Sequence, residues 1–133
     1  MKREIWWLED DLFFVRRIME PIRDRGWIVT TFETASELLE ELGRLSDCAL
    51  VVVDLLVPGG EGRPDERYAG VSVIKELAKQ RNCPPILVFS VVGRAEVLQD
   101  IEKYTKHILT KPVRLDVFID TVTALLEDEP AIA

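Results

Sequence analysis

The stretch Ala49-Leu50-Val51-Val52-Val53-Asp54 decides the fold class, because an unbroken apolar run ends abruptly in a carboxylate. A strand with one face in water would show a polar residue at every second position. The continuous run instead predicts a strand covered on both faces, as in a parallel sheet packed between helices. We therefore expect a sheet with helices on both sides of it.

Four further short apolar runs have the same character, and each is followed by a longer stretch of helical period. The predicted strands are residues 5–8, 27–30, 49–53, 86–89 and 107–110, and the predicted helices are 12–22, 33–42, 71–80, 94–104 and 113–126. Asp11 is the expected N-cap of the first helix. Either Thr31 or Thr34 is expected to cap the second helix, and Gly43 to end it.

This fivefold alternation of strand and helix predicts one α/β domain. Parallel strands with right-handed crossovers give a doubly wound (βα)5, flavodoxin-like, three-layer sandwich with the strand order 2-1-3-4-5. A (β/α)8 barrel would need eight such units and a much longer chain. The domain is expected over residues 1–127, with a long loop at 58–70, and residues 128–133 are a tail or the start of a linker.

Composition excludes several classes of protein. The 133 residues carry a net charge of −7, with 47% hydrophobic and 31% charged residues, which disfavours both a disordered chain and a general nucleic-acid binder. Two cysteines are too few for a disulfide framework, and a single histidine excludes most zinc sites. No apolar run reaches the ~20 residues of a membrane span, so we expect a cytoplasmic protein without membrane contact.

Polar residues follow four of the five predicted strands: Glu9, Asp10 and Asp11 after the first, Asp54 after the third, Ser90 after the fourth and Lys111 after the fifth. In an open α/β sheet the carboxyl ends of the strands form the ligand site. Clustered carboxylates repel one another unless a cation lies among them, and oxygen ligands suit Mg²⁺ or Mn²⁺. The carboxylate of Asp54 is a suitable acceptor for a phosphoryl group whose oxygens the metal, Lys111 and Ser90 would hold.

Each of these residues alone has an ordinary structural explanation. Acidic residues often cap helices, an aspartate after a strand often lies in a turn, and loop serines and surface lysines are common. The joint placement of all of them at the same end of their strands favours a binding site.

Four short segments carry a resemblance to a known family. They are Trp7-Leu8-Glu9-Asp10-Asp11, then Val51-Val52-Val53-Asp54 with Pro58 four residues later, Val88-Phe89-Ser90, and Leu109-Thr110-Lys111-Pro112. In this order and spacing, the chain from about residue 5 to 126 resembles the response-regulator receiver domain of two-component signalling, a CheY-like domain.

The resemblance implies a role for each matching residue. Asp54 corresponds to the phosphoacceptor, and Asp10 to the direct metal ligand. Glu9 corresponds to an acidic partner that acts through metal-bound water, and the backbone carbonyl of Leu56 to a further ligand. Ser90 and Lys111 correspond to the phosphoryl-binding hydroxyl and ammonium, and the Lys111–Pro112 bond would be cis.

The sequence departs from the family pattern in four places. Ile108 stands where an aromatic residue usually reports phosphorylation, and Tyr104 and His107, the nearest substitutes, are expected at the surface. Residues 103–107 replace the usual Gly-Ala before the fifth strand. An insertion between residues 62 and 70 contains Arg63 and Arg67, which either reach a phosphoryl group or a kinase, or lie in a solvated loop. Trp6 and Trp7 are large for their strand and are expected in the core.

The resemblance implies a signalling switch rather than an enzyme, beyond Mg²⁺-dependent self-phosphorylation and dephosphorylation. The expected partners are a histidine kinase or phosphotransfer protein and a downstream effector protein or domain, without direct contact to nucleic acid. A homodimer through helix 4, strand 5 and helix 5 is left open, as is whether the chain stands alone or belongs to a longer protein.

Three other functions are alternatives to this switch. A pseudo-receiver, which binds partners without being phosphorylated, is the main one. An aspartyl phosphatase of the haloacid-dehalogenase type would need a second aspartate where Leu56 stands, and a P-loop would need a Lys-Ser/Thr pair that Gly59-Gly60-Glu61-Gly62 lacks.

Overall fold

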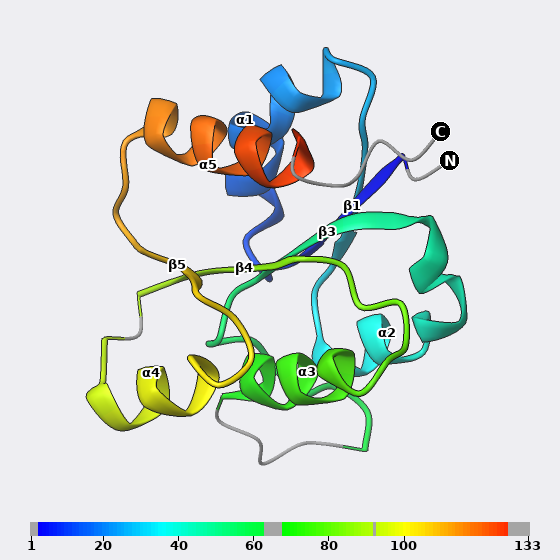
Figure 1. Cartoon of the computed structure of the whole chain (residues 1–133), viewed down its shortest axis with the longest axis vertical. Coiled ribbons are helices and arrows are strands. Elements are labelled where there is room, and N and C mark those ends of the chain that lie inside the picture. The colour runs from blue at the N-terminus through cyan, green and yellow to red at the C-terminus, as the bar shows by residue number, and fades with distance from the viewer. Residues whose placement is uncertain (1–2, 63–67, 92, 128–133) are drawn as a thin grey trace.

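A computed structural model describes residues 3–62, 68–91 and 93–127. One parallel sheet runs in the order β2-β1-β3-β4-β5, which confirms the predicted fold class. Its strands are β1 (Glu4–Leu8), β2 (Ile28–Phe32), β3 (Cys48–Val53), β4 (Ile86–Ser90) and β5 (His107–Thr110). The helices are α1 (Leu12–Arg23), α2 (Ala35–Leu39), the 3₁₀ helix η1 (Leu42–Asp47), α3 (Ala69–Ala78), α4 (Ala95–Ile101) and α5 (Leu115–Glu127). Helices α1 and α5 cover one face of the sheet, and α2, α3 and α4 cover the other (Figure 1).

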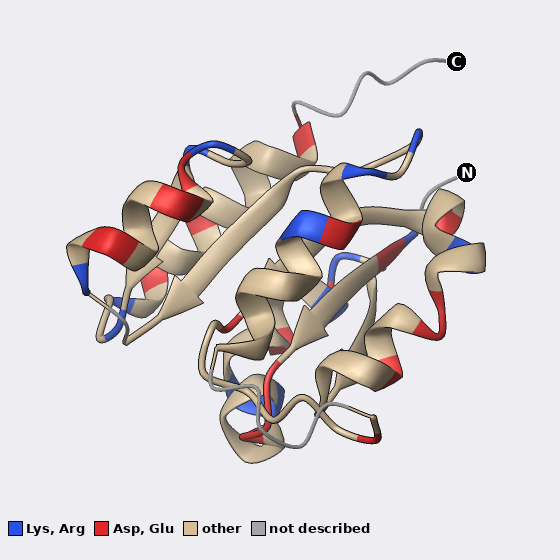
Figure 2. Cartoon of the chain, turned by 90° about the horizontal axis from the view of Figure 1, so that it is seen from below, with Lys and Arg blue, Asp and Glu red and all other residues tan. Residues whose placement is uncertain are grey.

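The strand register brings the carboxyl ends of the strands to one edge. Leu8 of β1 is level with Phe32 of β2 and with Val53 of β3, and Val53 is level with Val88 of β4. In Figure 2 the arrowheads of neighbouring strands point the same way. Residues that directly follow different strands therefore meet in space, which is what positions the site.

The core has two layers because successive residues of a strand point to opposite faces. Trp6 packs with the α2, α3 and α4 layer, and its ring centroid lies 5.3 Å from that of Phe32. Trp7 packs with the α1 and α5 layer and stacks on Phe118 at 5.3 Å. Both indoles are fully buried, which confirms the predicted core placement.

The second helix differs from the prediction at its C-terminal end. Thr34, not Thr31, caps α2 by accepting a hydrogen bond from the backbone N–H of Glu37. The helix ends at Leu39, and η1 runs through Gly43, so the predicted stop at Gly43 is wrong; the tighter 3₁₀ turns bring Leu45 into the core.

Helix α4 ends at Ile101 instead of Tyr104. The reason is a tertiary contact: the hydroxyl of Thr105 donates a hydrogen bond of 2.6 Å to the carbonyl of Ile86, which draws the chain back to the sheet. The prediction failed here because no local pattern in the sequence records a contact between residues so far apart.

The predicted loop at 58–70 is shorter than expected, since α3 already begins at Ala69. A Cβ atom at Gly70 would collide with the backbone carbonyl oxygen of Asp54, so only glycine lets the helix begin this close to the end of β3. The start of the loop lies against α2, where the carbonyls of Pro58 and Gly59 accept backbone hydrogen bonds.

Among the described helices, none is both long and apolar enough to cross a membrane.

Candidate functional site

The residues expected at the site converge at the carboxyl edge of the sheet. Glu9 follows β1, Asp54 follows β3, Ser90 is the last residue of β4, and Lys111 follows β5. Backbone hydrogen bonds fix these positions: the N–H of Asp54 donates to Leu8, and the N–H of Lys111 donates to Ser90. Four segments that are distant in the sequence thus present their side chains to one point.

The carboxylate of Asp54 is held from two sides. Its Oδ1 accepts hydrogen bonds from the Ser90 hydroxyl at 2.7 Å and from the Leu56 backbone N–H at 3.1 Å. Its Oδ2 accepts a hydrogen bond from the Lys111 ammonium at 3.1 Å. Asp54 is only 6% exposed, so a ligand can approach its oxygens from a narrow range of directions.

Glu9 is the most buried carboxylate of the site, at 2% exposed. Its Oε2 accepts a hydrogen bond of 2.8 Å from Lys111. Burial, with a smaller contribution from the negative charge of Asp54, raises the pKa of Glu9 to about 7, although the hydrogen bond from Lys111 acts in the opposite direction. A cation placed beside Glu9 would favour its ionised form, so the donor set suits a positive ligand.

Asp10 completes a group of three carboxylates. One ligand oxygen each from Glu9, Asp10 and Asp54 lie within 4.8 Å of one another, and Asp10 is exposed to solvent. Such oxygens at a half-open edge fit Mg²⁺ or Mn²⁺, which keep several waters in their coordination shell. The structure thus places the predicted metal ligands together; the role of the Leu56 carbonyl stays a prediction, because the contact seen at Leu56 is made by its N–H.

Two phenylalanines that were not among the predicted site residues support Lys111. The ammonium lies 5.1 Å from the ring centroid of Phe14 and 5.2 Å from that of Phe89. Cations are attracted to aromatic faces at such distances. Burial lowers the pKa of Lys111, but the hydrogen bonds and charges of Glu9 and Asp54 outweigh it and leave the pKa raised, so the side chain stays charged.

The N-cap of α1 explains how Phe14 reaches this position. The carboxylate of Asp11 accepts a hydrogen bond of 3.1 Å from the backbone N–H of Phe14, which confirms Asp11 as the cap and fixes the first turn. Phe89 directly precedes Ser90, and this position next to a predicted site residue is the only feature of the sequence that points to Phe89. No sequence pattern singles out Phe14.

The structure places most of the residues at which the sequence departs from the family pattern. The Lys111–Pro112 bond is cis, as expected. Ile108 is half-buried and packs against the core layer of α2, α3 and α4, while Tyr104 is 40% exposed and His107 is exposed, as predicted. Arg63 and Arg67 lie outside the described residues, so their role stays a prediction.

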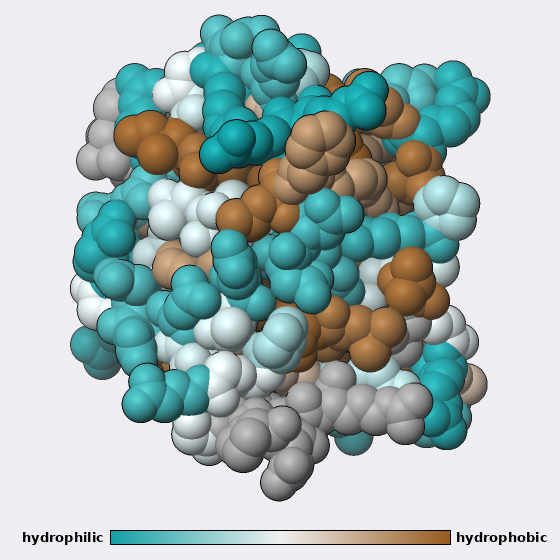
Figure 3. Space-filling view, turned by 180° about the vertical axis from the view of Figure 1, so that it is seen from behind, coloured by the Kyte–Doolittle hydropathy of each residue, from teal (hydrophilic) through white to brown (hydrophobic). Residues whose placement is uncertain are grey.

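Three hydrophobic side chains on the segments that carry the site residues are exposed. Phe13 is 75% exposed, Leu56 is 40% exposed and Val91 is 57% exposed, and each lies within three residues of a site residue in the sequence. Figure 3 shows one face on which a hydrophilic centre is flanked by hydrophobic patches. These exposed apolar side chains lie on the segments that also carry Asp10, Asp54 and Ser90.

No known protein-family model matches the sequence, and no curated relative matches it. Among solved structures, a CheY-like response regulator receiver domain from Methanospirillum hungatei is similar with a TM-score of 0.76 at 16% identity, over 96% of this chain and 95% of that one. The receiver domain of a Francisella response regulator gives 0.74 at 21% identity, over 95% and 98% of the two chains.

A third similar structure belongs to a longer protein. The Thermotoga maritima response regulator DrrB, an OmpR/PhoB homolog, gives a TM-score of 0.74 at 20% identity, over 96% of this chain and 54% of DrrB. The fold of this chain is therefore the CheY-like fold of response-regulator receiver domains, with the acidic cluster at the carboxyl edge of its sheet.

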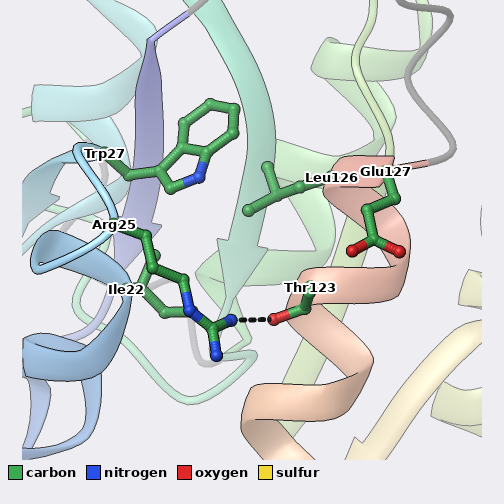
Figure 4. Close-up of a pocket in the computed structure, with 6 residues that line it drawn as sticks. All are labelled: Ile22, Arg25, Trp27, Thr123, Leu126 and Glu127. Carbon is green, nitrogen blue, oxygen red and sulfur yellow. Dashed lines mark hydrogen bonds between the residues drawn. The ribbon is translucent and has the colours of Figure 1, made fainter.

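A separate hollow of about 350 Å³ lies at the opposite end of the sheet, between the C-terminal ends of α1 and α5 (Figure 4). Trp27 and Leu126 line it, and the Arg25 guanidinium closes one side by donating a hydrogen bond of 2.9 Å to Thr123. It shares no residue with the site around Asp54.

Proposed function

We propose that this chain is a phosphoacceptor receiver domain of a two-component system, in which Asp54 takes a phosphoryl group in the presence of Mg²⁺. One observation carries the proposal: both oxygens of the Asp54 carboxylate are already oriented, one by the Ser90 hydroxyl and one by the Lys111 ammonium, beside two further carboxylates. Neither a cap nor a turn aspartate needs such an arrangement.

The chemistry assigns a task to each group. An oxygen of Asp54 attacks the phosphorus atom, and the bond from phosphorus to the donor breaks, with the electron pair leaving on the donor. Lys111 neutralises one oxygen of the transferred group, and the Ser90 O–H donates a hydrogen bond to another. A metal ion held by Glu9, Asp10 and Asp54 would supply the remaining positive charge.

The proposed phosphodonor is a histidine kinase or a phosphotransfer protein. The exposed side chains of Phe13, Leu56 and Val91 support this, because apolar side chains on the segments that carry the site residues suit docking of a protein donor. Signalling further requires that a downstream effector protein or domain binds the two states with different affinity.

The test uses the full chain, Mg²⁺ and a small phosphodonor such as acetyl phosphate, with intact-mass spectrometry as the readout. The unmodified chain should gain one phosphoryl group, and the gain should disappear in Asp54→Ala and on removal of Mg²⁺ by a chelator. Asp116→Ala, which removes an exposed carboxylate on α5, is the matched control and should be phosphorylated normally. A mass gain that persists in Asp54→Ala would contradict the proposal.

The second candidate is a pseudo-receiver that binds partners without phosphorylation. Ile108 favours it, since a half-buried aliphatic side chain stands where the aromatic reporter of the family is expected. Failure of the chain to take a phosphoryl group from acetyl phosphate, phosphoramidate and a panel of histidine kinases, while Mg²⁺ still binds, would support this alternative.

A further inference from the structure

The lysines of this chain are distributed very unevenly. The chain has six lysines, and four of them line two adjoining hollows: Lys75, Lys79, Lys103 and Lys106. Of the other two, Lys111 belongs to the site at Asp54 and Lys2 lies outside the described residues. In a chain with a net charge of −7, this concentration of lysines is a distinct local feature.

The two hollows adjoin each other and are here together called the lysine groove. One hollow, of about 610 Å³, lies between the start of β4 and the connection from α4 to β5, where Lys103 and Lys106 border it. The other, of about 380 Å³, lies along α3 beside Lys75 and Lys79. Both are lined by Ala78 and Tyr104, so the hollows meet at the Tyr104 ring, which is 40% exposed.

The groove lies at the amino ends of β4 and β5, and Asp54 lies at the carboxyl edge of the same sheet. Figure 2 looks onto the α3 and α4 side of the molecule and shows basic segments near the C-terminal ends of both helices. An occupant of the groove would therefore leave the carboxylates at the other edge accessible.

The floor of the groove is held in place by Thr105, which is 8% exposed. Its hydroxyl donates to the carbonyl of Ile86 and accepts from the backbone N–H of His107 at 3.1 Å. These bonds tie the connection before β5 to the first residue of β4. The groove is thus formed before a partner arrives, and a partner need not bear the cost of ordering it.

The cations of the groove are available to a partner. Lys75 lies 3.0 Å from Asp100 and Lys79 lies 3.0 Å from Glu76, but these side chains are 42% and 68% exposed. Exposed ion pairs contribute little free energy, so an incoming carboxylate can replace the internal one. Lys106 makes no ion pair with any residue that the structure describes.

We propose that the lysine groove binds an acidic segment of a partner protein, with an apolar side chain of that segment against Tyr104 and carboxylates beside the lysines. Charge complementarity supports the acidic character, because the four lysines outnumber the nearby carboxylates, which are Glu76 and Glu102 in the lining and Asp100 beside Lys75 and Lys103. The apolar part follows from Tyr104, Pro84 and Ala78, since an aromatic ring flanked by apolar surface is typical of the centre of a protein interface.

The same features argue against nucleic acid. Glu76 and Glu102 lie in the groove itself, where they would repel a continuous phosphate backbone but leave room for separate carboxylates. The cations are lysines rather than arginines, so the planar fork that binds phosphate through two hydrogen bonds is absent from the described lining. The negative charge of the rest of the chain also repels a polyanion at long range.

The test titrates the ¹⁵N-labelled full chain with a synthetic peptide of Glu, Asp and a central Leu, followed by NMR. The shifted amides should lie in residues 72–79, 83–86 and 102–107, and affinity should fall with added salt. A peptide with Ser in place of Leu should bind more weakly. The double variant Lys103→Glu, Lys106→Glu should reduce affinity about tenfold or more, and so should Tyr104→Ala.

The matched control is Arg16→Glu, Arg17→Glu, which reverses two exposed charges on α1 and should leave peptide affinity unchanged. All variants should keep the dispersed spectrum of the folded chain and their Mg²⁺-dependent phosphorylation. Absence of shifts in the groove, equal binding by the Lys103 and Lys106 double variant, or tighter binding of a single-stranded oligonucleotide than of the peptide would each overturn the proposal. Phosphorylation is measured separately, so this outcome is independent of the proposed function.

Discussion

The two ends of the sheet use lysine in opposite ways. At the carboxyl end, Lys111 has a side chain that is 18% exposed and is held by Glu9, Asp54 and two aromatic rings. At the amino end, four lysines lie at the surface. Lys75, Lys79 and Lys103 pair with carboxylates that are 34% or 39% exposed, and Lys106 has no ion pair with a described residue. Loss of a buried charge leaves its partners buried and unpaired, so one particular residue is required at that position. Each exposed charge contributes little free energy, so one exposed lysine can be replaced with little loss of stability.

The sharpest test of this contrast makes the same substitution at both ends. Lys111→Met should lower the free energy of unfolding by about 3 kcal/mol, because it leaves Glu9 and Asp54 buried without their cation. Lys106→Met should change it by less than about 0.5 kcal/mol. Urea unfolding monitored by circular dichroism measures both. Added Mg²⁺ should restore part of the loss in the Lys111 variant, and equal losses at the two positions would contradict the contrast.

A second prediction concerns how tightly the carboxyl end is packed. Gly70→Ala should lower the free energy of unfolding by about 1–3 kcal/mol, because the new methyl group meets the Asp54 carbonyl and displaces either α3 or the end of β3. It should also slow phosphorylation of Asp54. The matched control is Gly43→Ala, which has open space around it and should be neutral or slightly stabilising in the same urea experiment.

At the amino end of the sheet, we expect substitution of Thr105 to lower the free energy of unfolding more than any other single substitution considered there. Thr105→Val keeps the shape of the side chain but removes both hydrogen bonds, which should cost about 1–2 kcal/mol and speed hydrogen exchange of the His107 amide. Thr121→Val removes an exposed hydroxyl that donates to Val117 within α5, and it should change stability by less than about 0.5 kcal/mol. If both variants behave alike, the Thr105 contacts do not hold the groove.

The smallest effect is expected for the surface ion pairs. Asp100→Asn removes the partner of Lys75 and Lys103 and should cost about 0.5 kcal/mol at low salt. In 1 M salt the difference from the unmodified chain should vanish, because screening weakens exposed charges. If Asp100→Asn still lowers the free energy of unfolding in 1 M salt, the ion pairs at the amino end are not screened and resemble the buried ion pairs of Lys111.

The sequence was sufficient for the fold and for most of the site, and the reason is topological. Continuous apolar runs such as Val51–Val53 identify strands locally, and parallel connection then forces Glu9, Asp54 and Lys111 to the same edge without knowledge of any contact. No side-chain packing had to be known for this step.

What the sequence did not reveal depends on tertiary contacts. The end of α4 is set by the bond from Thr105 to Ile86, and the course of η1 by the burial of Leu45. The support of Lys111 by Phe14 requires the cap of α1 and the end of β5 to be placed relative to each other. The lysine groove likewise joins residues from α3 and from the start of β5, which are separated in the chain.

The neighbouring Trp6 and Trp7 give the two core layers separate spectroscopic reporters. Each indole lies in its own layer, and the buried N–H of each has no acceptor among the described residues. Trp7 belongs to the aromatic group that includes Phe14 and Phe89, the rings beneath Lys111, while Trp6 faces the opposite layer. In a variant that keeps only Trp7, emission therefore reports events at Lys111, and a second variant that keeps only Trp6 serves as the reference on the other side of the same strand.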